Sequence, residues 1–241
     1  MNVRRNVRLS EAPPRLLKAY AVLEEDDNTG GIVFATHAVT ARRRGANLFN
    51  NDEFNGVSCR RAPWADQYAA TGNVPASVAI AHGWWYECHG CGATINEDWL
   101  HENDLPLDGV VGFDRAAVFC SAICKAEQNL HDAMRYDHER RAIKLLEKLV
   151  LKRFPGVSFV RTEGLTPHAY ATSHDGVWIL EQASVSFDFP GMTYGPATLS
   201  VRRRYSSEIG PVRPVFSCCT GDQEAFLAFS TAGEVVQSES V

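Results

Sequence analysis

The sequence lacks a long apolar run. None of its windows approaches about 18 uninterrupted apolar residues, so we predict no membrane span. It also lacks a secretory signal, because the basic N-terminus (Arg4, Arg5 and Arg8) is not followed by an apolar stretch. The cysteine usage described below predicts a reducing cytoplasm.

Catalytic motifs are missing as well. His168 and His174 flank a predicted turn at Asp175, but no nucleophile elbow accompanies them. We see no internal repeat and no low-complexity tract, and nothing implies a small-molecule substrate. The net charge of −5 argues against a general nucleic-acid coat protein, because such proteins are usually basic.

Four cysteines in two short pairs are the most informative feature that is present. Cys88 and Cys91, followed by Gly92, have the spacing of a zinc knuckle. Cys120 and Cys124 stand one helical turn apart at the start of a predicted helix, whose N-terminus favours thiolates. Four thiolates enclose a zinc ion tetrahedrally and leave no position for water. We therefore predict a structural Zn²⁺ bound by these four cysteines.

Two alternatives to this ligand set stay open. His82, His89 or His101 could replace one cysteine, or the four thiols could be buried without metal as small apolar groups. The odd total of seven cysteines, mostly in metal-type spacing, indicates a reducing compartment rather than a disulfide framework. Cys218 and Cys219 are adjacent in a predicted strand and point to opposite faces, so at most one could join Cys59 in a site.

The run Val118-Phe119-Cys120-Ser121-Ala122-Ile123-Cys124 resembles the Phe-Cys-Ser-x-x-Cys element of FCS-type (MYM/TRASH-like) zinc fingers. The resemblance covers residues 85–125 and implies a treble clef, in which a knuckle and a helix start share one metal. It implies an interaction module rather than an enzyme. The acidic insertion between the cysteine pairs is longer than in compact members of that group.

A treble clef can also carry an HNH nuclease site. His101, Asn103 and His131 are the candidates for its histidine base and metal ligand. The sequence lacks the Asp-His step and the Asn-Leu element that such a site needs, so a metal-dependent nuclease is the third hypothesis.

The predicted fold class is α+β. Strands at 17–24, 32–35 and 57–61, with a helix at 37–49 capped by Thr36, form an N-terminal β-β-α-β unit. A short helix at 77–82 precedes the cysteine region.

A long helix runs from Ser121 to Phe154, where Pro155 and Gly156 end it, and a break near Asp137 is the alternative. An antiparallel sheet and a short helix from Gln223 follow. Its predicted strands are 177–180, 183–189, 198–201 and 212–219, and the helix ends at 229.

This pattern predicts five segments along the chain. They are a basic tail (1–14), a small α+β domain (15–76), a zinc module with the long helix (77–155), a β domain (156–232) and a C-terminal tail (233–241).

Arginine runs are candidate phosphate contacts for nucleic acid, although such runs are usually solvated faces. The candidates are Arg42, Arg43, Arg44, Arg60, Arg61, Arg202, Arg203 and Arg204. The aromatic run Trp84-Trp85-Tyr86 predicts core packing beside the zinc module, with a protein interface as the second interpretation.

Several stretches resemble uncharacterised accessory proteins of proteobacterial phages and prophages. They are 32–35 with 41–47, 57–63, 83–88 with Cys91, 189–191 with Tyr194-Gly195, and Gly221-Asp222. The resemblance implies action in the host cytoplasm. The leading hypothesis is a non-enzymatic, zinc-stabilised binding protein that modulates a host protein, for example as a defence-system inhibitor. The alternative is a nucleic-acid-binding protein that uses the arginine clusters.

Overall fold

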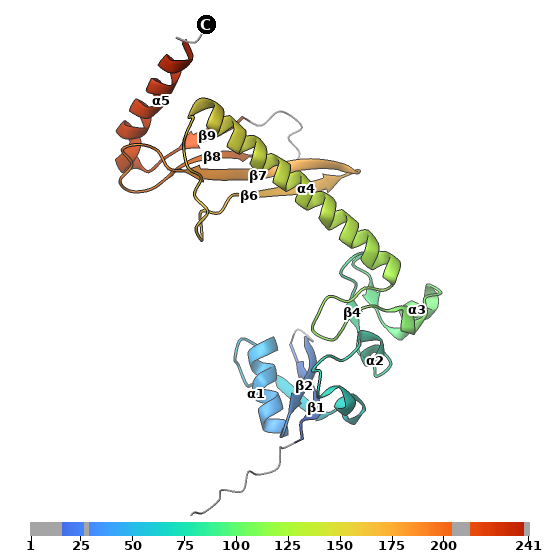
Figure 1. The fold of residues 1–241 in the computed structure, drawn as a ribbon. Coiled ribbons are helices and arrows are strands. Elements are labelled where there is room, and N and C mark those ends of the chain that lie inside the picture. Colours follow the sequence, from blue (N-terminus) through green and yellow to red (C-terminus); the bar gives the residue numbers. More distant parts are fainter. Residues whose placement is uncertain (1–15, 27–28, 204–212, 239–241) are drawn as a thin grey trace, which may run out of the picture. The chain divides into compact units, whose positions relative to one another are not determined.

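The computed structural model describes residues 16–26, 29–203 and 213–238 (Figure 1). Contacts divide the chain into two compact units, residues 1–128 and 129–241, and each unit has hydrophobic cores built from its own residues. The α+β class is confirmed: strands and a helix come first, then the cysteine region leading into a long helix, then an antiparallel sheet. The predicted tail at 1–14 lies outside the described residues.

The first unit opens with a three-stranded antiparallel sheet in the order β2-β1-β3. The strands are β1 (Lys18–Glu24), β2 (Gly30–Ala35) and β3 (Val57–Arg61). Helix α1 (Ala38–Phe49) covers one face of this sheet.

Helix α1 lies very close to the sheet, because Gly45 faces Val22 with no room for a Cβ between them. The helix cap differs from the prediction. His37, in extended conformation, occupies the N-cap in place of Thr36, and it makes no side-chain capping hydrogen bond.

A second layer covers part of the opposite sheet face. It consists of a 3₁₀ turn, η1 (Pro63–Tyr68), and helix α2 (Ala76–Ile80). Ala79 of α2 packs toward the sheet, while Ala76 and Ile80 pack into the core around the cysteines. Helix α2 therefore contributes to two cores at once.

The cysteine region contains several short elements. Strands β4 (Tyr86–Glu87) and β5 (Thr94–Ile95) form a small hairpin. Helix α3 (Glu97–Glu102) follows, and Oδ1 of its N-cap Asn96 accepts a hydrogen bond from the Trp99 amide at 2.7 Å. The turn η2 (Leu107–Gly109) leads back toward the second cysteine pair.

Helix α4 (Ala122–Arg153) is continuous over 32 residues, so the break near Asp137 does not occur. Ion pairs within the helix join Asp137 to Arg140 at 2.8 Å and to Arg141 at 2.5 Å, and they stabilise its polar middle. The helix ends where predicted, before Pro155 and Gly156. Within the described residues we find no helix with the length and apolarity that a membrane crossing requires.

The second unit contains a four-stranded antiparallel sheet in the order β6-β7-β8-β9. Its strands are β6 (His168–His174), β7 (Val177–Phe187), β8 (Ala197–Arg202) and β9 (Val215–Ser217). Strand β7 is one long strand where two were predicted, and β6 was not predicted. Asp175 and Gly176 join β6 to β7 with φ of 50° and 76°, the positive values of a type I′ turn.

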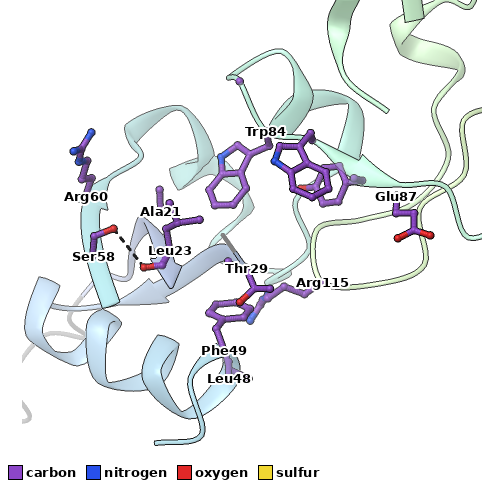
Figure 2. Close-up of a pocket in the computed structure, with 14 residues that line it drawn as sticks. Ala21, Leu23, Thr29, Leu48, Phe49, Ser58, Arg60, Trp84, Glu87 and Arg115 are labelled. Atoms are coloured by element: carbon purple, nitrogen blue, oxygen red, sulfur yellow. Dashed lines mark hydrogen bonds between the residues drawn. The ribbon is translucent and has the colours of Figure 1, made fainter. Parts of the chain in front are cut away.

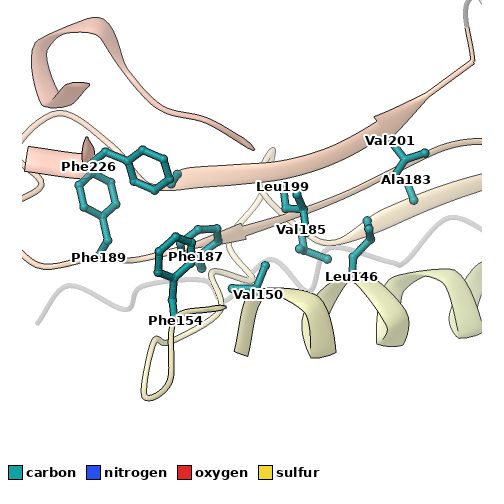
Figure 3. Close-up of a cluster of buried hydrophobic side chains, with 11 residues drawn as sticks. Leu146, Val150, Phe154, Ala183, Val185, Phe187, Phe189, Leu199, Val201 and Phe226 are labelled. Atoms are coloured by element: carbon teal, nitrogen blue, oxygen red, sulfur yellow. The ribbon is translucent and has the colours of Figure 1, made fainter. Parts of the chain in front are cut away.

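The last turns of α4 pack on β7 and β8 (Figure 3). Leu146, Val150 and Phe154 of the helix side meet Val185 and Phe187 of the sheet. Helix α5 (Gln223–Ser238) closes this core through Phe226 and extends beyond the short helix predicted at 223–229. The turn η3 (Thr220–Asp222) precedes it.

Candidate metal centre

The four predicted ligands lie together in the first unit. Cys88 and Cys91 are in the turn between β4 and β5, Cys120 lies two residues before the first residue of α4, and Cys124 is in the first turn of that helix. All four Sγ atoms lie within 4.8 Å of one another, with 3.5 Å between Cys88 and Cys124 and 3.9 Å between Cys91 and Cys120. Tetrahedral Zn–S bonds of about 2.3 Å place sulfurs about 3.8 Å apart. The sulfurs thus have the spacing of a tetrathiolate metal site.

The knuckle that holds the first pair is closed by its backbone. The Gly92 amide donates to the Cys88 carbonyl at 2.9 Å, and Gly92 has a φ of +73°, which glycine adopts without strain. A Cβ on Gly90 would lie 2.6 Å from Sγ of Cys124. The close approach of knuckle and helix therefore requires a glycine at position 90.

The thiol electrostatics favour a cation at this place. Burial opposes ionisation of Cys88, but amides of Cys91, Cys120 and Gly90 outweigh it and lower the pKa of Cys88 to about 6. Burial raises the pKa of Cys120 and of Cys124, and the neighbouring Cys88 adds to both shifts. Without a cation the four thiols cannot all ionise, whereas a bound divalent metal compensates four thiolates.

The histidine alternatives for the ligand set lie elsewhere. His82 stacks on Trp64 with ring centroids 4.2 Å apart, and His89 meets the edge of Phe119 at 5.6 Å. His101 lies in the last turn of α3. Among the described residues, the four cysteines are the only group of three or more histidine, cysteine, aspartate or glutamate side chains that lie close enough to share a metal ion.

The remaining cysteines do not join the cluster. All seven cysteines are free thiols. The Cys59 thiol donates to the Ala38 carbonyl at 3.5 Å, and burial raises the pKa of Cys59 and of Cys218. Cys219 is exposed, so it offers a matched control for the exposed ligand Cys91.

Three of the predicted phosphate-contact arginines have structural partners in the first unit. Arg42 donates to the Phe54 carbonyl at 3.1 Å and lies over its ring. Arg44 donates to the Phe34 carbonyl at 2.7 Å. The third, Arg61, forms a two-pronged ion pair with the Asp66 carboxylate, at 2.6 and 2.9 Å.

The other arginines differ in their contacts. The side chains of Arg43 and Arg60 in the first unit and of Arg202 in the second are exposed, and they make no hydrogen bond or ion pair with any described residue. Nε of Arg203 donates to the Leu180 carbonyl at 3.0 Å. Arg204 lies outside the described residues.

The histidine candidates for catalysis have packing roles. In the second unit, His131 and His138 both contact the Trp178 ring, with centroids 4.9 and 5.5 Å apart. His168 lies 3.2 Å from the hydroxyl of its cross-strand neighbour Ser184 on an exposed sheet position, and no carboxylate completes a triad among the described residues.

Asp114 is a residue whose role the sequence did not reveal. It lies at the end of the acidic insertion, yet it is only 6% exposed. Its carboxylate accepts hydrogen bonds from the Ile32 amide of β2 at 2.6 Å and from the Tyr86 hydroxyl at 3.0 Å. Burial raises the pKa of Asp114 and of Tyr86 above their usual values. Asp114 thereby fastens the cysteine region to the outer edge of the sheet.

A groove of about 850 Å³ extends from the sheet face that α1 does not cover to the last two residues of α1, Leu48 and Phe49 (Figure 2). Its floor is formed by Ala21, Leu23 and Ser58, with Arg60 beside them, and Trp84 stands over it (Figure 2). Trp85 also lines the groove and is 53% exposed. The aromatic run is therefore only partly core, because Trp84 packs against the sheet while Trp85 faces solvent.

Comparison with known proteins gives this chain no family. No family model, no curated protein and no solved structure matches it.

Proposed function

We propose that this chain is a non-enzymatic binding protein in which Cys88, Cys91, Cys120 and Cys124 hold a structural Zn²⁺ in a treble-clef arrangement. The observation that carries the proposal is that four sulfurs, two from the β4–β5 turn and two from the start of α4, lie within 4.8 Å of one another. With four protein thiolates as ligands, the ion has no open position for water or substrate. Its contribution is to the folding free energy of the first unit.

Metal content of the purified chain tests this part of the proposal. We expect one zinc per chain and, after exchange to Co²⁺, the absorption bands of a tetrahedral thiolate complex. Cys91→Ser should abolish stoichiometric binding, whereas Cys219→Ser, which changes another exposed cysteine, should leave it intact. A metal-free chain with the same stability as the zinc-loaded one would refute the structural role.

The partner surface in this proposal is β3 with the adjoining groove. Strand β3 is an edge of the sheet and pairs only with β1 among the described residues. An extended peptide can add to such an edge through main-chain hydrogen bonds, while pockets beside it select side chains. Tryptophan and arginine dominate the binding energy of many protein interfaces, and the groove offers Trp85 and Arg60.

The opposite edge of the sheet, β2, is partly occupied by charged side chains. On β2 the Ile32 amide donates to Asp114, and the Phe34 carbonyl accepts from Arg44. Charged side chains thus occupy hydrogen-bonding groups that a docking strand would need. This asymmetry supports β3 as the docking strand.

The resemblance to phage and prophage accessory proteins is the reason for proposing a host protein as the partner, with inhibition of a defence system as one outcome. Affinity capture from a proteobacterial lysate tests it. We expect one stoichiometric partner, lost in Trp85→Ala and Arg60→Glu but retained in Val39→Ser, which alters another exposed apolar residue of the same unit. Equal capture by all variants would rule out the groove.

Single-stranded nucleic acid is the second candidate, because the same groove combines exposed Arg60 with Trp84 and Trp85, on which bases could stack. It predicts binding that weakens steeply with salt and falls in Arg60→Ala. Binding that ignores salt, or no binding, removes this candidate. The nuclease hypothesis gains no support from His131, whose ring packs on Trp178.

A further inference from the structure

Strand β3 has unpaired main-chain groups along its outer edge. The Ala62 amide donates to the Ala19 carbonyl at 3.0 Å, and in an antiparallel pair every second residue bonds the same neighbour. Ser58 and Arg60 therefore turn their amides and carbonyls toward β1, whereas those of Cys59, between them, turn outward. Among the described residues, none hydrogen-bonds the outward amide and carbonyl of Cys59. An added strand would find these groups free.

The side chains of Ser58 and Arg60 lie on the groove face of the sheet, at its open edge. In the register of the two strands, Ser58 lies beside Leu23 of β1, and Arg60 lies beside Ala21 (Figure 2). Two rows of side chains therefore run from the open edge into the groove. One begins with a serine and continues with a leucine, and the other begins with a guanidinium.

The row that begins with Arg60 calls for a negative charge on an added strand. The Arg60 side chain is exposed and makes no hydrogen bond or ion pair with a described residue. Figure 2 shows Glu87, the acidic residue of the groove lining, at the opposite end of the groove. Opposite charges directly across an antiparallel pair stabilise it, and like charges destabilise it. An acidic side chain across from Arg60 is therefore the electrostatic complement of this row.

The row that begins with Ser58 has space for a large apolar side chain. The short Ser58 side chain donates to the Leu23 carbonyl at 3.4 Å and so stays close to the sheet (Figure 2). Leu23 is only half-buried, and Gly30 of β2 follows it in the row. Trp84 stands over this floor. A bulky apolar side chain across from Ser58 would cover Leu23 beside Trp84, and its burial is favourable.

We propose that the docking segment of the partner is an extended peptide with the order acidic residue, any residue, large apolar residue, added antiparallel to β3. This rests on the proposed function, in which the same groove binds a partner protein. The antiparallel direction is that of the other pairs in this sheet and is the more stable per residue. It places the acidic residue across from Arg60, the middle residue across from Cys59 and the apolar residue across from Ser58.

Titration of the zinc-loaded full chain into fluorescein-labelled peptides, followed by anisotropy, tests the order and the charge. A peptide centred on Thr-Glu-Thr-Phe-Thr should bind several-fold more tightly than one centred on Thr-Phe-Thr-Glu-Thr. Lysine in place of the glutamate should weaken binding about fivefold. Arg60→Glu should reverse this preference between glutamate and lysine. Arg43→Glu, which changes another exposed arginine of the first unit, should keep it.

N-methylated peptides test the strand pairing. In the antiparallel addition the amide of the middle threonine donates to the Cys59 carbonyl, whereas the amide of the phenylalanine turns away from β3. N-methylation of the middle threonine should therefore abolish binding, and N-methylation of the phenylalanine should leave it intact. Equal loss from both modifications would show that the peptide does not extend the sheet in this register.

Three further results would overturn the proposed docking sequence. They are equal binding in both orders, tighter binding of the reversed order, and no binding of the glutamate-first peptide up to about 1 mM. Capture of a protein that depends on Trp85 and Arg60, found together with one of these results, leaves the proposed function standing. Capture that ignores both residues removes the groove as the partner site, and the docking sequence with it.

Discussion

Gly90 is the residue on which the metal centre depends most closely besides its ligands. A Cβ at this position would lie 2.6 Å from Sγ of Cys124, closer than such contacts occur, so the sulfur would have to move. We expect Gly90→Ala to lower zinc affinity at least tenfold in a chelator competition titration. Gly195→Ala, where nothing lies within 4 Å of the added methyl group, should bind zinc as the unaltered chain does. Equal affinities for both variants would contradict the geometry.

In the second unit, the Asp222 carboxylate holds the loop at residues 193–195 by hydrogen bonds. It is 2% exposed, and its carboxylate accepts hydrogen bonds from the amides of Thr193, Tyr194 and Gly195 at 2.7, 2.8 and 3.1 Å. Burial opposes ionisation of Asp222, but these amides outweigh it and lower its pKa. The ionised group therefore stabilises the fold above its ordinary pKa of about 3.9, and this contribution is lost as pH falls through the lowered value.

Asp222→Asn should accordingly lower the melting temperature of the second unit by several degrees at pH 7. The difference from the unaltered chain should shrink as pH falls through the lowered pKa of Asp222, because the side chain at position 222 is then uncharged in both proteins. Thermal denaturation followed by circular dichroism, from pH 7 into the acid range, measures it. Glu224→Gln, at an exposed position two residues on, should have little effect at any of these pH values. A pH-independent difference would show that ionisation of Asp222 is not the cause.

Single residues also show where sequence reasoning stops. The metal ligands could be predicted because their pairs are close in sequence and their spacing is specific. Asp114 and Asp222 could not, because each is fixed by amides far along the chain. Asp114 and Ile32, for example, are 82 residues apart. In the sequence of an acidic segment, a carboxylate that becomes buried cannot be told from one that stays solvated, because its hydrogen-bond donor is distant along the chain.

Among the elements, α1, β3 and α4 were predictable because local signals agree on them. Apolar periodicity and the Pro155-Gly156 stop define α4. Strand β6 was missed because its sequence, HAYATSH, is short of large apolar residues and forms a strand only by pairing with β7. The cap at Thr36 was wrong because side-chain type alone does not fix the residue at which the backbone turns helical.

The Asp114 carboxylate joins the acidic insertion to the sheet, and among contacts between elements we expect it to contribute most to the stability of the first unit. Asp114→Ala leaves the Tyr86 hydroxyl and the Ile32 amide without their partner, at a cost of about 1–3 kcal/mol for each buried group. Urea unfolding should show this loss, and hydrogen exchange at the Ile32 amide should quicken. Asp108→Ala, in an exposed part of the same insertion, should change neither measurement. Unchanged exchange at Ile32 would mean that the Asp114 carboxylate does not protect that amide.

For the whole molecule, the separation of the cores predicts separate responses to metal removal. The residues around the cysteines belong to the first unit, and the core of Phe154 and Phe187 belongs to the second. We expect chelation to shift only one of two transitions in calorimetry, and hydrogen exchange to quicken only before residue 129. A single transition that moves as a whole after chelation would contradict two independent units.

The outer edge of β2 has a consequence for how copies of this protein can combine. The Asp114 carboxylate accepts from the Ile32 amide, and Arg44 donates to the Phe34 carbonyl, so the β2 edge of the sheet is blocked while the β3 edge is open. A continuous fibril needs both edges, because each strand must pair with a neighbour on either side. Two copies that pair through their β3 edges leave only β2 edges on either side, so the combined sheet stops growing.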